Sequence, residues 1–263
     1  MLITDAINLK KITPLARENI AKACYDEVFV KIWEGVNYTD FYHMFFSTAD
    51  SEKIFLFKTT DQKLAGYLIY RVMEIAIEER AFAVGRLSTN VLPHYFGQNL
   101  IHRIVFLESS KFFLKNLFTK RTFVLFFTAN SPASYCIFKR RSRKVFPCPV
   151  LGVPEPFRQL MLDACQRFHI PLDDKVNFVT SYTVRLKQEV VVKMDLSQKN
   201  DDIYRFYMKH CPRYHEGQAM VTMKPIYAMD GFIDMAQQIF RLSHIRLEFY
   251  RKMFRIWIFG KKP

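Results

Sequence analysis

One stretch, residues 81–141, constrains the fold of this 263-residue chain more than any other. Ala81–Val91 is rich in β-branched and apolar residues and stops just before a proline, as a strand does. Residues 98–118 carry apolar side chains at helical spacing, and Arg121–Ala129 is an apolar run of strand length. Pro132 then favours the first turn of another helix. The stretch therefore predicts strand, tight turn, helix, strand and helix in that order.

A β-hairpin is predicted ahead of this stretch. Lys53–Lys58 and Leu64–Met73 are apolar runs on either side of a short polar turn. Gly66 lies inside the second run, which indicates a bulge or a close backbone contact. Earlier still, the pattern predicts a strand over residues 1–9, a helix that begins at Thr13-Pro14 and a helix near residues 39–46.

Four prolines between residues 147 and 156 indicate a domain boundary or a long ordered loop. We place a boundary there and expect a domain over residues 1–150 and a C-terminal extension over 151–263 that completes the sheet and adds helices. The pattern of the later chain predicts a helix at Pro156–Phe168, a strand at Asn177–Leu186, a further strand at Glu189–Met194, a helix at Ser197–His210 and a long helix at Asp230–Phe259.

Composition and charge limit the setting and the partners. The net charge of +14 favours acidic partners such as nucleotide phosphates, nucleic acid, an anionic membrane or an acidic protein. The five cysteines are scattered without a C-x-x-C pair, and neither a signal peptide nor a membrane-spanning run is evident, so a reduced, cytoplasmic location is expected. The arginine-rich C-terminal helix would either close the core or bind an anionic membrane or partner protein.

Two motifs in the central stretch resemble the GNAT superfamily of N-acetyltransferases. The run Val91-Leu-Pro-His-Tyr-Phe-Gly97-Gln98 resembles the strand-to-helix turn of that family. The run Asn130-Ser-Pro-Ala-Ser-Tyr135 resembles its N-x-x-A-x-x-x-Y region, with the tyrosine two residues early. The family's acyl-CoA pyrophosphate signature falls on residues 96–101, and all three of its defining positions differ here.

The resemblance implies an α/β (α+β) fold with a central mixed, mostly antiparallel sheet, splayed strands and flanking helices, followed by a helix-rich extension. It also implies an N-acyltransferase that uses acetyl-CoA or another acyl-CoA and an amine acceptor. Its proton donor to the leaving thiolate would be Tyr135. The positions that would hold the cofactor are Val91, Gly97, Gln98, Asn99, Leu100 and Asn130.

Each of these residues also has a structural interpretation. Tyr135 could pack on its helix, and Asn130 could cap that helix. Glu78, in the turn after the hairpin, is a candidate general base, but exposed turn carboxylates are common. The basic block Lys139–Lys144 could attract the 3′-phosphate of coenzyme A or form a solvated face.

Two function classes therefore remain open. The first is the N-acyltransferase, and the second is a catalytically inactive GNAT-like module that binds an acidic partner or a membrane surface. Direct nucleic-acid binding rests on charge alone and ranks below both. Residues 210–216 include metal-ligand types, but their spacing matches no zinc pattern, so we expect no metal and a loop that ends at Gly217.

Overall fold

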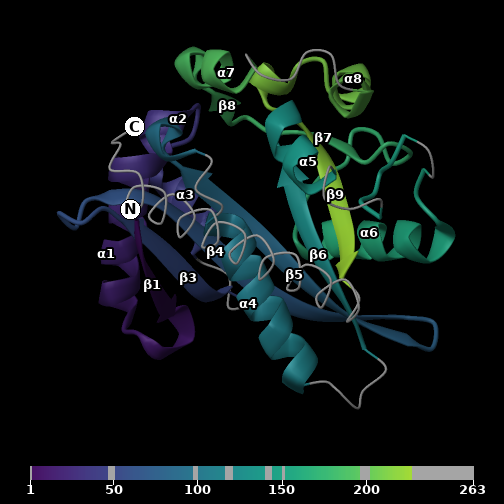
Figure 1. Ribbon diagram of the computed structural model, residues 1–263, viewed down its shortest axis with the longest axis horizontal. Coiled ribbons are helices and arrows are strands. Elements are labelled where there is room, and N and C mark those ends of the chain that lie inside the picture. Colours follow the sequence, from purple (N-terminus) through teal and green to yellow (C-terminus); the bar gives the residue numbers. More distant parts are fainter. Residues whose placement is uncertain are drawn as a thin grey trace, which may run out of the picture.

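A computed structural model describes residues 2–46, 51–96, 100–115, 121–139, 144–149, 152–195 and 202–226. Its main feature is a seven-stranded sheet in the order β1-β3-β4-β5-β6-β9-β7, with helices around it (Figure 1). A second, short pair joins β2 to β8. The strands are β1 (Ile3–Asn8), β2 (Trp33–Glu34), β3 (Ser51–Lys58), β4 (Leu64–Ile77), β5 (Arg80–Val91), β6 (Thr122–Ala129), β7 (Val179–Ser181), β8 (Arg185–Leu186) and β9 (Gln218–Ile226).

Side-chain caps explain where the first helices begin. The backbone N–H of Ala16 donates to the Thr13 hydroxyl at 3.2 Å, and the N–H of Asp40 donates to Asn37 Oδ1 at 2.9 Å.

The helices are α1 (Pro14–Cys24), which continues as a π-helical turn (Tyr25–Phe29), α2 (Val30–Ile32), α3 (Tyr38–Phe45), α4 (Leu100–Lys115), α5 (Pro132–Lys139), α6 (Glu155–Arg167), α7 (Gln188–Asp195) and α8 (Asp202–His210).

The pairing within the sheet is mixed. β5 and β6 are parallel, whereas the other described pairs of this sheet are antiparallel. Parallel neighbours need a crossover connection, and α4 provides it. The long β4–β5 hairpin runs from Gly66 opposite Val91 to Ile77 opposite Arg80. This mostly antiparallel sheet with flanking helices confirms the predicted fold class. The predicted hairpin of residues 53–58 and 64–73 is the β3–β4 pair, and the central stretch has the predicted strand–helix–strand–helix order.

Different helices cover the two faces of the sheet, because alternate residues of a strand point to opposite faces. The α4 face carries Phe123, whose ring lies 4.9 Å from that of Phe112 in α4. The α6 face carries Phe126, whose ring lies 5.4 Å from that of Phe168 at the end of α6. Buried apolar side chains therefore form a core on each side of the sheet.

Two predictions for the later chain are wrong. Asn177–Leu186 forms two short strands, β7 and β8, which belong to different sheets. Glu189–Met194 lies within helix α7 rather than a strand, although its valines favour β structure. Val190 and Val191 are buried in the main core, so tertiary packing outweighs their intrinsic preference.

The sequence pattern also does not predict β9, which pairs with both β6 and β7. Its sequence, QAMVTMKPI, contains alanine, lysine and proline, which are depleted in strands. Nearly every residue of β9 is buried, so no apolar–polar alternation marks it as a strand.

The proposed boundary after residue 150 stays a prediction. β9 pairs with β6 over Phe123–Ala129, so the later chain contributes to the same sheet as the earlier chain. The helix expected at 230–259 and residues 140–143 of the basic block lie outside the described residues. None of the described helices is both long and apolar enough to cross a membrane.

Gly66 shows the close backbone contact that its position in a strand predicts. A Cβ atom added there would lie 2.7 Å from the Asn90 carbonyl oxygen and 2.9 Å from the Cα of Val91. A register irregularity between β3 and β4 occurs beside it, at Phe57. Glycine therefore lets β4 approach the last residues of β5.

We predict that Gly66→Ala lowers the free energy of unfolding by about 1–3 kcal/mol, because β5 must move to admit the methyl group. This loss exceeds the roughly 0.5–1 kcal/mol that alanine otherwise gains over glycine in a strand. Chemical denaturation at 25 °C measures it. The control Ala76→Ser, at an exposed position of the same strand, should stay within about 0.5 kcal/mol of the wild type. Equal stability of Gly66→Ala and wild type would contradict the prediction.

Glu108 is a buried carboxylate that ties α4 to β3. Its oxygens accept hydrogen bonds from Lys53 Nζ at 2.5 Å and from Lys111 Nζ at 2.8 Å. Burial by itself raises the pKa of Glu108, but the two ammonium groups outweigh burial and leave the pKa below its ordinary value.

We predict that Glu108→Gln lowers the free energy of unfolding at pH 7 by about 1–2 kcal/mol, because the lysines are partly exposed and screened. A carboxyl group whose pKa is lowered in the folded state stabilises the fold above its unfolded pKa of about 4.3 and loses this effect as the pH falls through the folded pKa. The difference between wild type and Glu108→Gln should therefore shrink below about pH 4. Urea denaturation from pH 7 to pH 3 tests this, with exposed Glu155→Gln as control. A pH-independent difference would refute it.

Candidate functional site at the fork between β5 and β6

β5 and β6 run side by side and then part, and the place where they part is the candidate site. They pair from Phe82 opposite Thr122 to Leu87 opposite Phe127. Beyond these residues β5 stays with β4, while the end of β6 stays with β9 (Figure 1). We name this place the fork. Among the described strands none bridges it, so backbone groups on its inner edges can hydrogen-bond an extended ligand.

Two of the predicted cofactor residues lie on the α4 side of the fork. Val91, the last residue of β5, is half-buried, and Leu100 is buried at the start of α4. The predicted turn residues Gly97, Gln98 and Asn99 lie outside the described residues. Phe96, just before them, is 41% exposed.

Asn130 follows β6 directly and carries an unsatisfied acceptor. Its Oδ1 is buried and has no hydrogen-bond partner among the described residues. The cap of α5 is its neighbour Ser131, whose hydroxyl accepts from the N–H of Ser134 at 3.2 Å. Of the two roles open to Asn130, helix capping therefore belongs to Ser131. A buried acceptor without a partner usually has one that is not yet identified.

Tyr135, the expected proton donor, lies in α5 with its hydroxyl enclosed. The side chain is fully buried, and its hydroxyl donates to the Pro147 carbonyl oxygen at 2.6 Å. Burial raises the pKa of Tyr135 well above its ordinary value. Its ring lies 5.9 Å from those of Phe206 and Tyr207 in α8. This placement favours the packing role.

Glu78, the candidate general base, lies far from the fork. It is exposed in the turn between β4 and β5, with a φ of +53°. Arg80 pairs with Ile77 at this end of the hairpin, whereas Val91 lies at the other end. An extended strand of that length spans on the order of 35 Å. The structure does not bring the Glu78 carboxylate to the fork.

Asn90 is a fork residue that no sequence motif singles out. Its Oδ1 accepts a hydrogen bond from Trp33 Nε1 at 2.5 Å, and its Nδ2 donates to the Tyr67 hydroxyl at 2.8 Å. Asn90 is buried in β5, and Trp33 begins β2, so these bonds tie the segment before α3 to the edge of the fork. The one available signal was an asparagine inside a strand, where this residue is depleted.

Polar side chains line the α6 side of the fork. Arg86 is half-buried, its Nη1 donates to the Phe168 carbonyl oxygen at 3.3 Å, and its guanidinium lies 5.0 Å from the centre of the Phe168 ring. Burial lowers the pKa of Arg86, which nevertheless stays protonated. On the β6 side, the hydroxyls of Thr128 and Tyr182 lie 3.3 Å apart. Burial raises the pKa of Tyr182.

Helix α8 occupies one backbone acceptor at the end of β6. The Tyr207 hydroxyl donates to the Ala129 carbonyl oxygen at 2.8 Å. Tyr207 is fully buried, and burial raises its pKa well above the ordinary value. This helix from the later chain therefore holds the last residue of β6 in place.

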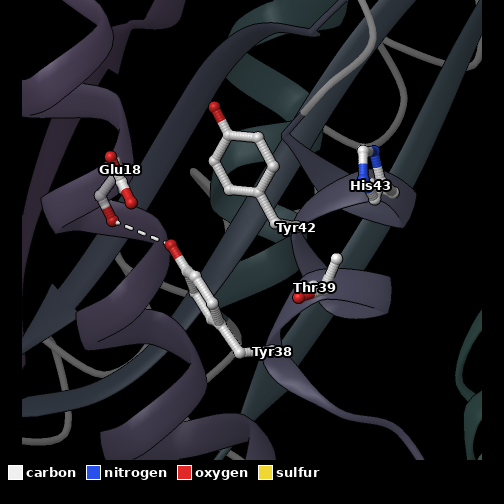
Figure 2. Close-up of a pocket in the computed structure, with 5 residues that line it drawn as sticks. All are labelled: Glu18, Tyr38, Thr39, Tyr42 and His43. Atoms are coloured by element: carbon white, nitrogen blue, oxygen red, sulfur yellow. Dashed lines mark hydrogen bonds between the residues drawn. The ribbon is translucent and has the colours of Figure 1, made fainter.

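A hollow of about 250 Å³ lies between α1 and α3. Figure 2 shows Tyr38 of α3 extending toward Glu18 of α1, with the Tyr38 hydroxyl donating to the Glu18 carbonyl oxygen at 3.4 Å, and Tyr42 beside it. Thr39 and His43 complete its lining. None of these lining residues belongs to β5, β6 or α4.

Metal ligands and reactive thiols do not gather in the described part of the chain. No group of three His, Cys, Asp or Glu side chains there could hold a metal ion. Gly217, with a φ of +100°, ends the loop after α8 as predicted. All five cysteines fall within the described ranges and are buried without disulfides. Burial raises the pKa of Cys165 and of Cys211 to about 12, so neither is a thiolate at neutral pH.

No protein-family model and no curated protein matches this chain. It is similar to a solved protein of Enterococcus faecalis V583 described as a probable N-acyltransferase, with 12% identity and a TM-score of 0.36 over 55% of this chain and 32% of that one. It is also similar to a ribosomal-protein-alanine N-acetyltransferase from Brucella melitensis biovar Abortus 2308, with 10% identity and a TM-score of 0.30 over 47% and 80% of the two chains. A third is an aminoglycoside acetyltransferase from an uncultured soil metagenomic sample, with 14% identity and a TM-score of 0.32 over 54% and 87%.

The matched region spans about a third of the Enterococcus protein. At such identities and TM-scores, these likenesses carry no argument about the activity of this chain.

We predict that Asn90→Leu lowers the free energy of unfolding by about 2–4 kcal/mol, because the Tyr67 hydroxyl and the Trp33 indole both lose a partner. Urea denaturation measures the loss. A double-mutant cycle with Tyr67→Phe should give a coupling of about 1 kcal/mol, since the two side chains share a hydrogen bond. Strictly additive effects of the two substitutions would rule out that shared bond.

Proposed function

We propose that this chain is an acyl-CoA-dependent N-acyltransferase of the GNAT type, which holds acetyl-CoA or another acyl-CoA at the fork and transfers the acyl group to an amine. The observation that carries the proposal is the parting of the parallel strands β5 and β6 beside the start of α4. The fork coincides with the strand-to-helix turn whose sequence resembles that superfamily.

The residues of the fork suit the parts of such a cofactor. The backbone of Val91 would pair with the amide groups of the pantetheine arm, in place of a strand partner. The buried Oδ1 of Asn130 would accept a hydrogen bond from one of those amides. Gly97, Gln98, Asn99 and Leu100 would present backbone N–H groups to the pyrophosphate at the N-terminus of α4.

When bound, an acyl-CoA supplies a thioester carbon that an amine nitrogen attacks, so that a C–N bond forms, the C–S bond breaks and the proton lost by nitrogen ends on the thiol. The fork would contribute by holding the thioester and the amine in line. The enclosed hydroxyl of Tyr135 and the distant carboxylate of Glu78 support neither as the group that moves the proton.

Two observations favour a second candidate, a catalytically inactive GNAT-like binding module. The Tyr135 hydroxyl is committed to Pro147, and the defining positions of the pyrophosphate signature are changed. Such a module would bind a thioester or an acidic partner without transfer, and the net charge of +14 suits an acidic partner.

We predict saturable binding of acetyl-CoA, or of a longer acyl-CoA, to the full chain in calorimetric titrations. Asn130→Leu should weaken it roughly 3- to 10-fold, the effect of one lost hydrogen bond. Gly97→Val should also weaken acyl-CoA binding, because a bulky side chain would obstruct the turn that we expect to bind the pyrophosphate. The matched control is Gln166→Leu on the exposed side of α6, which should leave the affinity unchanged.

Release of the coenzyme A thiol from acyl-CoA, measured with and without amines, then distinguishes the transferase from the inactive module. Release that depends on the amine supports the transferase, whereas binding without release favours the inactive module. A folded protein that binds no thioester would contradict the proposed site.

A further inference from the structure

Arg86 is a cation at the fork that forms no ion pair with an acidic side chain among the described residues. It lies in β5 opposite Phe126 of β6, one residue before the last paired position, Leu87. Its side chain is on the α6 face, where the polar side chains of Ser88 and Thr128 flank the parting strands. Arg86 therefore lies beside the place where β5 and β6 part.

The described contacts of Arg86 leave most of its donors unused. Its Nη1 donates a hydrogen bond to the Phe168 carbonyl oxygen, and the ring of Phe168 lies against the guanidinium on one side. Among the described residues no aspartate or glutamate forms an ion pair with it. A guanidinium has five N–H donors, so several remain for a ligand.

The remaining donors are not sealed from solvent, because no Arg86 nitrogen is among the fully buried, unpaired side-chain atoms of the described chain. The side chain as a whole is half-buried. Phe168 therefore holds the Arg86 guanidinium on one side, and the planar group keeps free N–H donors. This arrangement suits bidentate binding of a carboxylate.

We propose that Arg86 binds the carboxylate of the acceptor, so that the acceptor is an amino acid, with an amine and a carboxylate in one small molecule. This inference rests on the proposed function and names its substrate class. The carboxylate pairs with the guanidinium on the α6 face, and the amine of the same molecule points into the fork. Thr128, on the other strand of the fork, and its hydroxyl partner Tyr182, which follows β7, would border the bound acceptor.

The test compares ligands that differ by the carboxylate alone. Each common amino acid and its decarboxylated amine, such as phenylalanine and phenethylamine, is titrated into the full chain, with saturation-transfer NMR as the binding signal. At least one amino acid should bind about 10- to 100-fold more tightly than its amine, the range expected for charge-assisted hydrogen bonds to a carboxylate. Phosphoethanolamine against ethanolamine distinguishes a phosphate site from a carboxylate site.

Variants assign the preference to Arg86. Arg86→Gln should reduce the affinity for the preferred amino acid to the affinity for its amine. Arg86→Lys should have an affinity between those of Arg86→Gln and the wild type, because lysine keeps the charge but lacks the planar guanidinium group. The control Arg167→Gln removes one exposed positive charge from the neighbouring end of α6 and should stay within about twofold of the wild type. Near-ultraviolet circular dichroism establishes that each variant is folded.

Wild-type ligand preferences test the inference even if a variant fails to fold. No preference for any amino acid over its amine, tighter binding of phosphoethanolamine than of every amino acid, or equal losses in Arg86→Gln and Arg167→Gln would each overturn it. Acetyl-CoA binding in the same protein is measured separately. If acetyl-CoA binds without a carboxylate preference, this inference alone fails, and if amino acids bind through Arg86 but acetyl-CoA does not, the acyltransferase proposal alone fails.

Discussion

Parallel pairing of β5 with β6, in a sheet whose other described pairs are antiparallel, is the constraint on which this structure depends. Parallel neighbours cannot be joined by a tight turn, so the chain must cross over through α4. The crossover brings the end of β5, the start of α4 and the end of β6 to one edge of the sheet. Because each strand also has an antiparallel neighbour, β4 or β9, the two can part there without losing their other ladder.

The later chain maintains the fork from the other side. β9 pairs with β6 as far as Ala129, and the Tyr207 hydroxyl of α8 binds the Ala129 carbonyl oxygen. Phe168, at the end of α6, holds the Arg86 guanidinium by its ring and its carbonyl oxygen. Elements after residue 150 thus position groups that belong to strands before it, and the fork is a product of both parts of the chain.

The candidate residues show how burial and distance select among chemically suitable side chains. Tyr135 has a suitable phenol, but its hydroxyl is enclosed and committed to Pro147. Glu78 has a suitable carboxylate, but a long hairpin separates it from the fork. Asn90 and Arg86 belong to no motif, yet their cross-strand positions and contacts place them at the fork. A motif identifies chemistry, whereas strand register determines which side chains meet.

Local sequence patterns were sufficient to predict the β3–β4 hairpin, the strand–helix–strand order of residues 81–129 and the start of α5 at a capping residue and a proline. These features depend on residues that are neighbours in the chain. Local patterns were insufficient for β9 and α7, whose structure follows from long-range burial that outweighs propensity. The same holds for the polar edge of the fork. Trp33 meets Asn90, and Phe168 meets Arg86, across separations that no local pattern encodes. Such contacts arise when the sheet assembles, because pairing register and helix packing bring distant residues together.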